Sequence, residues 1–284
     1  MDPTIVLRTY RGAARRKTLL KKGVTRGVLA RAVADGRVVR ALYGVYALPD
    51  APRAQILRSA YQARVSCHSM CETLGLPIIK ADASVHLWVP RDRARRHDDT
   101  RPRDGVVIHR HDHKAPQGRE QIAIALDLLG VCHGRLQQIV AIDQALRRGL
   151  ITRERIAAFS HTPPDQVAWL VARCDPKAQS LIETITRVTL ADAGFRVSSQ
   201  VDVRGVGHVD LVVEGILAVE TDGEEHHNNP TAWAEDIRRN NACLDAGFIP
   251  VHFTYKDVMF GLAGVVAQVR RLLPHIPTTD TTDP

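Results

Sequence analysis

The segment GHVDLVVEGILAVETDGEEHH, residues 207–227, decides how the rest of the chain is interpreted. Its apolar runs, separated by Glu214-Gly215, predict two short strands joined by a tight turn. Asp210 lies in the first strand, and Glu220 and Asp222 close the second. Side chains alternate along a strand, so Glu220 and Asp222 are expected on one side, and a hairpin would bring Asp210 to the same end. The segment therefore predicts three carboxylates where the apolar strands end.

This acidic cluster has two interpretations. Like charges repel one another, and a bound divalent cation is the usual physical reason for holding carboxylates together. The alternative is that the acids end two strands at a solvated turn, with Asp222-Gly223 as an ordinary turn signal. Two further residues favour the cation site. His226 follows the turn, and Glu183 lies beside the apolar face of the helix predicted over SLIETITRVTL, residues 180–190.

The order of motifs resembles the very-short-patch-repair-like (Vsr-like) branch of the PD-(D/E)XK nuclease superfamily. The motifs are SLIET, VDLVV, AVETDGEEH, DIRRN and the strand FIPVHFTY, and they cover about the last third of the chain. The resemblance implies an endonuclease domain over residues 170–275, with a mixed sheet flanked by helices. Such a domain would hydrolyse phosphodiester bonds with Mg²⁺ or Mn²⁺. Because helices flank FIPVHFTY, we expect this strand inside the sheet.

The resemblance also implies a role for each residue of the catalytic set. Asp210 and Glu220 would bind the metal ion, and Glu183 would complete the acidic cluster. Asp222 and His226 would hold the metal-bound water or the leaving phosphate.

A supporting pair and two departures complete the comparison with this superfamily. Asp236 and Arg239, one helical turn apart, would brace the site or contact a phosphate. The superfamily's lysine, two residues after its acid, is replaced by Asp222, which is normal for this branch but removes the usual water activator. The cysteine and histidine zinc ligands of the repair enzymes are not evident in the sequence.

The composition limits the class of protein. The chain has 284 residues, enough for two domains or three small ones. No apolar run approaches the ~18 residues of a membrane span, and the N-terminus lacks the apolar core of a signal peptide. The five cysteines are scattered and odd in number, which suits a reducing cytoplasm. Cys67, His68 and Cys71 suggest a zinc site, but we find no matching second pair and expect buried structural thiols.

The formal net charge of +8 is unevenly distributed. Residues 1–50 hold eleven Lys and Arg against three acids, and residues 51–119 hold thirteen against seven. Residues 120–284 hold fifteen against twenty-one. A basic front and an acidic rear predict a phosphate-binding module attached to a metal-binding one. An arginine-rich proteome alone would raise Arg throughout and would leave the acidic rear unexplained.

Residues 1–50 predict a winged helix-turn-helix. Residues 1–23 are a basic arm, expected as a solvated surface. Thr25 is a good N-cap for a helix that Asp35-Gly36 would stop, and VVRALYGVYAL then alternates like two strands around Gly44. This outline places the helix that starts at Thr25 in the major groove.

Four arginines are the candidate DNA contacts of this domain beside Thr25. Arg26 and Arg31 lie on the polar side of the predicted helix, and Arg37 and Arg40 lie at the wing, where phosphates would be. The alternative is a basic helix and hairpin that bind no DNA.

The front of the chain resembles AbiEi-type antitoxins, which are winged-helix repressors of type IV toxin–antitoxin operons. The motifs are GVTR, GRVVR and GVYALP, followed by SCHSMCETLGLP, VHLWVP, GVVIHRH and AIDQALRRGLITRERIAAF. The resemblance implies that residues 51–165 form a small α/β platform, to which we assign no catalysis. In the HRHDH tract, His109, His111 and His113 would share one face of a strand. Without a partner at ligand spacing, we expect a solvated strand end.

The sequence thus predicts an α/β (α+β) protein and two main functions. The first is a cytoplasmic DNA-binding endonuclease that uses Mg²⁺ or Mn²⁺ in defence or in toxin–antitoxin control. The second is an AbiEi-type repressor with a silent nuclease fold, a possible cognate toxin and possible homo-oligomers. A third is a structural protein with two unrelated surface patches. Residues 276–284 lack apolar side chains and are expected to be disordered.

Overall fold

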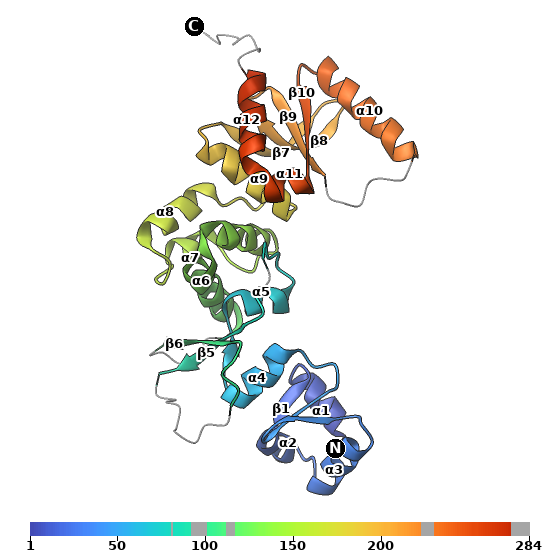
Figure 1. Ribbon diagram of the computed structural model, residues 1–284, viewed down its shortest axis with the longest axis vertical. Helices are drawn as coiled ribbons and strands as arrows, with labels where there is room; N and C mark the ends of the chain where they lie inside the picture. The colour runs from blue at the N-terminus through green and yellow to red at the C-terminus, as the bar shows by residue number, and fades with distance from the viewer. Residues whose placement is uncertain (81, 92–100, 112–116, 223–229, 274–284) are drawn as a thin grey trace. The chain divides into compact units, whose positions relative to one another are not determined.

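The computed structural model describes residues 1–80, 82–91, 101–111, 117–222 and 230–273. Over these residues the protein is of mixed α/β type, with twelve helices and three sheets. The chain divides into two compact units (Figure 1). The first comprises residues 1–141 and 150–171, and the second residues 142–149 and 172–284. None of the described helices combines the length and the apolar character that a bilayer crossing requires. The predicted disordered tail, 276–284, lies outside the described residues.

The first unit begins with a small helical bundle on a three-stranded antiparallel sheet. The sheet order is β1-β3-β2, and the described helices before β2 share one apolar core that includes Leu7, Leu19 and Leu29. The elements are α1 (Pro3–Thr9), β1 (Ala13–Arg15), α2 (Arg16–Lys21), α3 (Arg26–Ala34), β2 (Val39–Leu42) and β3 (Val45–Ala47).

The local signals of this region are confirmed in part. Thr25 caps α3, since its hydroxyl accepts a hydrogen bond from the Val28 N–H at 3.3 Å. Gly36 has φ +69°, a conformation that glycine adopts without strain, and it follows the end of the helix. The predicted basic arm is more ordered than expected. Its charged side chains are exposed, but residues 3–21 form α1, β1 and α2 because Val6, Leu7 and Leu19 enter the core.

The rest of the first unit is a second α/β layer. Its sheet order is β4-β5-β6, with β4 antiparallel and β6 parallel to the central strand β5. All residues of β5 except Pro90 are buried, as expected for a strand covered on both faces. The elements are α4 (Arg53–Tyr61), β4 (Arg64–Val65), α5 (Cys67–Leu74), β5 (Val85–Pro90), β6 (Val106–His111), α6 (Gly118–Arg147), α7 (Arg153–Ala157) and α8 (Pro164–Arg173).

Helix α6 is interrupted at Gly134. This residue has φ 79° and ψ 172°, which is not helical, so α6 consists of two helical segments that meet there. The break ends the first segment at Cys132 and His133. Residues 142–149, in the second segment, belong to the second unit of the chain.

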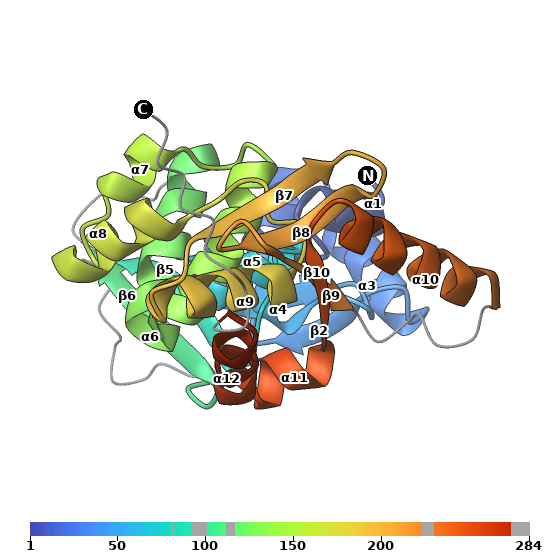
Figure 2. The ribbon, with the colours of Figure 1, turned by 90° about the horizontal axis from the view of Figure 1, so that it is seen from above.

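The second unit is built on a four-stranded mixed sheet. The sheet order is β10-β9-β8-β7, in which β10 is parallel to β9 and the other pairs are antiparallel. Figure 1 and Figure 2 show the sheet between α10 and the group α9, α11 and α12. The elements are α9 (Leu181–Asp192), β7 (Val197–Val203), β8 (Gly207–Val213), β9 (Leu217–Asp222), α10 (Pro230–Asp245), β10 (Ile249–Thr254), α11 (Tyr255–Phe260) and α12 (Leu262–Leu272).

The predicted hairpin is confirmed, and one strand position is wrong. Glu214 and Gly215 both have positive φ, of 52° and 72°, and the Ile216 N–H donates to the Val213 carbonyl. This is a two-residue turn that matches the twist of paired strands. Strand β10 was expected inside the sheet, but among the described strands it lies at the edge. It reaches β9 by a parallel crossover through α10, and no described segment pairs with its other side.

Candidate functional site

Three of the predicted acids lie near one another in the second unit, since Asp210 acts electrostatically on both Glu183 and Glu220, but their ligand atoms are not all within 4.8 Å of one another. Glu183 lies in the first turn of α9, where the Ser180 hydroxyl caps the helix by accepting a hydrogen bond from the Glu183 N–H at 3.1 Å. Asp210 lies in the middle of β8, and Glu220 lies near the end of β9. The Gln200 side-chain amide joins two of them, since its Nε2 donates to Glu183 Oε2 at 2.9 Å and to Asp210 Oδ1 at 3.2 Å.

Asp210 is held from a second side by Thr221. The Thr221 N–H donates to Asp210 Oδ2 at 3.0 Å, and the Thr221 hydroxyl lies 2.9 Å from the same oxygen. Both carboxylate oxygens of Asp210 therefore have fixed partners. These contacts cross from β8 to β9 and fix the orientation of the carboxylate without adding a positive charge.

Glu220 is the most perturbed acid of the cluster. Burial and the neighbouring Asp210 raise the pKa of Glu220 to about 7, against the opposing effect of Arg239. Arg239, on α10, donates to Glu220 Oε1 at 2.7 Å and to the His208 carbonyl at 2.8 Å. Burial also raises the pKa of Glu183, and Asp210 adds to this rise. Acids perturbed by burial and by each other are typical of functional sites, although structural ion pairs also produce them.

The remaining predicted residues of this site are placed differently. Asp222 is the last residue of β9, opposite Thr254 of β10 in the backbone register, and its side chain lies outside the description. His226 lies outside the described residues. Asp236 is exposed on α10, whereas Arg239, predicted as its partner, contacts Glu220. The structure thus joins Arg239 to the acids but does not place Asp236 among them.

The sequence gives no sign of Gln200 as part of this site. Its backbone has φ +50°, which is unusual for a residue other than glycine, and in β7 it lies opposite Asp210. Its side-chain oxygen accepts a hydrogen bond from Gln179 Nε2 at 2.8 Å, so its amide hydrogens are directed to the two acids. A polar residue in a strand carries no local signal for such a role.

The candidate DNA-binding residues differ in availability. Arg26 and Arg31 are exposed on α3. Arg37 pairs with Asp2 at 3.1 Å and with Asp35 at 3.3 Å, which reduces its charge available to a phosphate. The guanidinium carbon of Arg40 lies 5.6 Å from the centre of the exposed Tyr43 ring. Thr25 uses its hydroxyl to cap α3, so its role in the structure is to fix the start of that helix.

A basic hollow that the sequence analysis did not single out lies beside α2. It has a volume of about 270 Å³, and the charged residues that line it all carry positive side chains. These residues are Arg15, Lys17, Lys21 and Lys22, with Tyr10, Thr18 and Gln62 completing the wall.

The platform contains a metal-ligand cluster that the sequence interpretation missed. Cys67, His86, His109 and Cys132 form one group whose ligand atoms lie within 4.8 Å of one another, and Cys67, His68, His86 and His133 form another. Among the described residues, only these two groups bring three or more such ligand atoms together so closely. The expected burial of the Cys67 thiol is confirmed. The sequence around Cys67 shows no second pair of ligands, and the structure supplies them from distant parts of the chain.

The expectation of a solvated strand end at HRHDH is wrong for His109. The ring of His109 is half-buried, and its Nε2 lies 3.1 Å from His86 Nδ1 on the neighbouring strand. The side chains of His111 and His113 lie outside the description. The two thiols interact: a hydrogen bond with Cys132 raises the pKa of Cys67, and the same contact lowers the pKa of Cys132.

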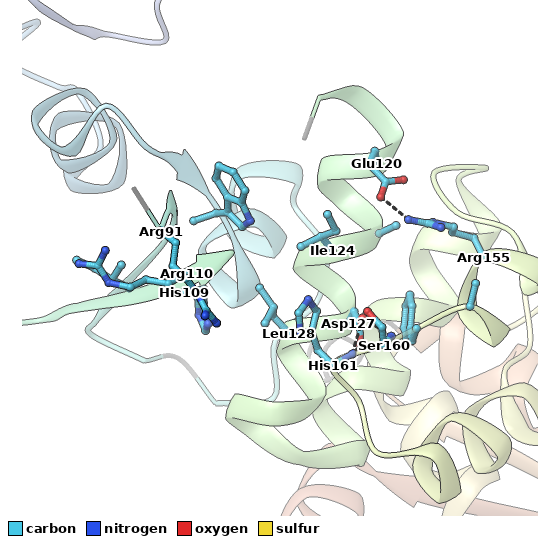
Figure 3. Close-up of a pocket in the computed structure, with 15 residues that line it drawn as sticks. Arg91, His109, Arg110, Glu120, Ile124, Asp127, Leu128, Arg155, Ser160 and His161 are labelled. Carbon is cyan, nitrogen blue, oxygen red and sulfur yellow. Dashed lines mark hydrogen bonds and ion pairs between the residues drawn. The ribbon is translucent and has the colours of Figure 1, made fainter. Parts of the chain in front are cut away.

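A larger cavity of about 610 Å³ opens between β6 and α6 (Figure 3). Its floor is fixed by Asp127, whose buried carboxylate accepts hydrogen bonds from the N–H groups of Ser160, His161 and Thr162 at 2.7–3.2 Å. Arg155 pairs with Glu120 across its rim. Arg91 and Arg110 add positive charge on the strand side. The hollow is polar and cationic, which suits an anionic group.

Comparison with known proteins leaves these sites to be interpreted from their own chemistry. The chain matches no family model, and a search of curated proteins finds no significant match.

Proposed function

We propose that this protein binds DNA and cleaves it with a metal-dependent endonuclease site in the second unit. The observation that carries the proposal is that Glu183, from a helix, and Glu220, from the next strand, each lie near Asp210. The order helix, three antiparallel strands, helix and parallel strand supports a Vsr-like PD-(D/E)XK domain. The α3 helix and the β2–β3 hairpin support a winged helix-turn-helix of the AbiEi type in the first unit.

The donor atoms of the acidic cluster fit a hard divalent cation. Asp210 and Glu220 offer carboxylate oxygens, the ligands that Mg²⁺ and Mn²⁺ prefer. Bound there, the ion would supply charge stabilisation to the scissile phosphate and lower the pKa of a water. Glu183 completes the negative charge of the site, and the Gln200 side-chain amide donates a hydrogen bond to Glu183 and another to Asp210. These features are what a two-carboxylate magnesium site requires of its surroundings.

Other residues of the chain would act on the substrate itself. Arg239 lies against Glu220 and carries the positive charge that a substrate phosphate needs. From the resemblance alone, Asp222 and His226 would hold the attacking water or the leaving group. In the first unit, Arg26 and Arg31 would contact the DNA backbone, with α3 in the major groove. Five free cysteines fit the cytoplasm that we assign to this activity.

The decisive experiment is plasmid nicking by the full chain with Mg²⁺ or Mn²⁺. We expect cleavage that EDTA abolishes and that Asp210→Asn lowers by at least a hundredfold, because this change removes a metal-binding charge and keeps the side-chain volume. Asp245→Asn, which changes an exposed acid at the end of α10, is the matched control and should retain activity to within a factor of about three. Equal activity of Asp210→Asn and the intact protein would refute the site.

A second candidate function is transcriptional repression of the AbiEi type, with a silent nuclease domain. One observation favours it: the cluster already has protein partners, since Arg239 pairs with Glu220 and Gln200 bridges Glu183 and Asp210. The partners would then be an operator and, as a protein partner, a cognate toxin or a second copy of the chain. Specific DNA retention without any metal-dependent cleavage would favour this function over the nuclease.

A further inference from the structure

Four elements of the platform direct metal-ligating side chains at one point. Cys67 is the first residue of α5, His86 lies in β5, His109 lies in β6, and Cys132 ends the first segment of α6. Their ligand atoms all lie within 4.8 Å of one another. The side chains of Cys67 and His86 are buried, whereas His109 is half-buried and Cys132 is exposed, so the point of convergence lies at the edge of the domain interior. Because the four ligands come from separate elements, their proximity results from the packing of the domain and not from the spacing within one helix or loop.

The spacing of these atoms agrees with tetrahedral coordination. Zinc binds histidine nitrogen at about 2.0–2.1 Å and thiolate sulfur at about 2.3 Å, which implies N···N separations of about 3.3 Å and S···N separations of about 3.6 Å in a tetrahedron. His86 Nδ1 and His109 Nε2 are 3.1 Å apart. Cys132 Sγ and His109 Nε2 are 3.9 Å apart. Both separations are within a few tenths of an ångström of the tetrahedral values.

The outer contacts of His86 are those of a metal-binding histidine. Its Nε2 lies 3.0 Å from the Ser84 hydroxyl and 3.5 Å from an Asp82 carboxylate oxygen. A proton on Nε2 leaves the Nδ1 lone pair directed at the cluster. Metal-binding histidines almost always donate their other ring N–H to a carboxylate, a carbonyl or a water in this way.

Two further histidines lie beside this cluster, each with a buried ring nitrogen that has no partner in the described part of the chain. His68 Nδ1 and His133 Nε2 are buried without a hydrogen-bond partner among the described residues. His68 is 1% exposed, and its ring centre lies 4.4 Å from that of His86. A buried polar atom left without a partner costs about 1–3 kcal/mol, so such atoms are rare unless the site serves a ligand.

The backbone at Cys67 points to the same conclusion. Cys67 has φ +50°, in the left-handed region that a residue with a Cβ avoids. Strained backbone of this kind collects at ligand and active sites, where the surrounding structure holds it. In this conformation the Cys67 sulfur lies within 4.8 Å of the Cys132 sulfur.

We propose that Cys67, His86, His109 and Cys132 bind one zinc ion that ties α5, β5, β6 and α6 together. Two thiolates neutralise the charge of the ion, and the set of two cysteines and two histidines is common in structural zinc sites. The other group, with His68 and His133, contains a single cysteine and would leave the ion positively charged in a buried place. A disulfide between Cys67 and Cys132 would not explain why the imidazoles of His86 and His109 lie at the same point. The site is separate from the proposed magnesium site, which lies in the second unit.

The test is the metal content of the full chain, purified without a metal-affinity tag and measured by plasma mass spectrometry. We expect about one zinc per chain, and less than a tenth of that in Cys132→Ser and in His109→Gln. Cys71→Ser, a buried thiol of α5 outside the ligand set, and His252→Gln, in the second unit, are the matched controls and should keep the zinc.

A second measurement covers the case in which ligand variants fail to fold. Co²⁺ exchanged into the intact protein should give the visible bands of a four-coordinate site and thiolate-to-metal charge transfer in the near ultraviolet. Three results would each overturn the proposal: no zinc and no cobalt spectrum in the intact chain, zinc retained in Cys132→Ser, or a Cys67–Cys132 disulfide in the metal-free protein. Loss of zinc in His68→Gln and His133→Gln but not in His109→Gln would overturn the ligand assignment.

Discussion

Single residues determine much of the stability of the second unit. Asp143 is fully buried and accepts hydrogen bonds from Arg187 at 2.7 Å, from Thr184 at 3.0 Å and from the Asp175 N–H at 2.7 Å. Arg187 is 6% exposed, and a second carboxylate, that of Asp175, lies 4.0 Å from its Nε. Removing one member of a buried ion pair leaves the other without compensation, which makes this pair a sensitive point of the fold.

We expect Asp143→Ala to lower the free energy of unfolding by about 3–5 kcal/mol, because it leaves a buried guanidinium without its carboxylate. Urea denaturation followed by circular dichroism measures the change. Asp245→Ala, which removes an exposed acid in the same unit, should change the stability by less than about 0.5 kcal/mol. A loss below 1 kcal/mol in Asp143→Ala would mean that Arg187 finds another partner or solvent.

Asp143 also makes the free energy of unfolding depend on pH. Burial raises the pKa of Asp143 from 3.8 to about 6, so the folded state holds this proton more tightly than the unfolded chain. Folding then takes up a proton between these pKa values, and the contribution of Asp143 to stability falls as the pH rises from about 4 to 6 and is constant above that. The difference in unfolding free energy between the intact protein and Asp143→Asn should follow this course. If this difference in unfolding free energy instead rises with pH over the same range, the pKa of Asp143 is lowered by folding and not raised.

At the scale of elements, the sequence predicted the features that neighbouring residues determine, such as turns and helix caps. The hairpin turn at Glu214-Gly215 and the Thr25 cap were predictable because neighbouring residues fix them. The edge position of β10 was not, since it depends on the crossover through α10. The His/Cys cluster was also missed, because its ligands come from four elements and no two of them have the close spacing of a zinc motif. Gln200 was missed for the same physical reason.

Helix α3 provides a prediction at this scale. Arg26→Ala with Arg31→Ala should weaken DNA binding and reduce the slope of log K against log salt by about 1.8, if each arginine neutralises one phosphate. Gel shift or fluorescence anisotropy at several salt concentrations measures the slope. Arg270→Ala with Arg271→Ala removes two exposed charges from α12 and should leave the slope unchanged. An unchanged slope in the α3 variant would move the DNA contact elsewhere, and the basic hollow beside α2 would be the next candidate.

At the scale of the whole molecule, charge and chemistry are divided along the chain. The basic residues concentrate before residue 120, and the acid cluster lies in the second unit. We therefore expect Asp210→Asn to lose cleavage while its DNA affinity stays within about twofold of the intact protein, measured by anisotropy in EDTA. The variant with both α3 arginines replaced should bind DNA more weakly and cleave little at low DNA concentration. Its cleavage should return when the DNA concentration is raised. Parallel loss of both properties in Asp210→Asn would contradict a division of labour between the units.

The interrupted helix α6 has a practical consequence for dissecting the chain into fragments. Residues 142–149 belong to the second unit although residues 150–171, later in sequence, belong to the first. A fragment that ends at residue 171 would keep Asp143 but lose Arg187, and one that starts at residue 172 would keep Arg187 but lose Asp143. The two units are thus interleaved in the sequence, and no single cut separates them intact. A fragment that holds the whole second unit has to begin upstream of Ile142.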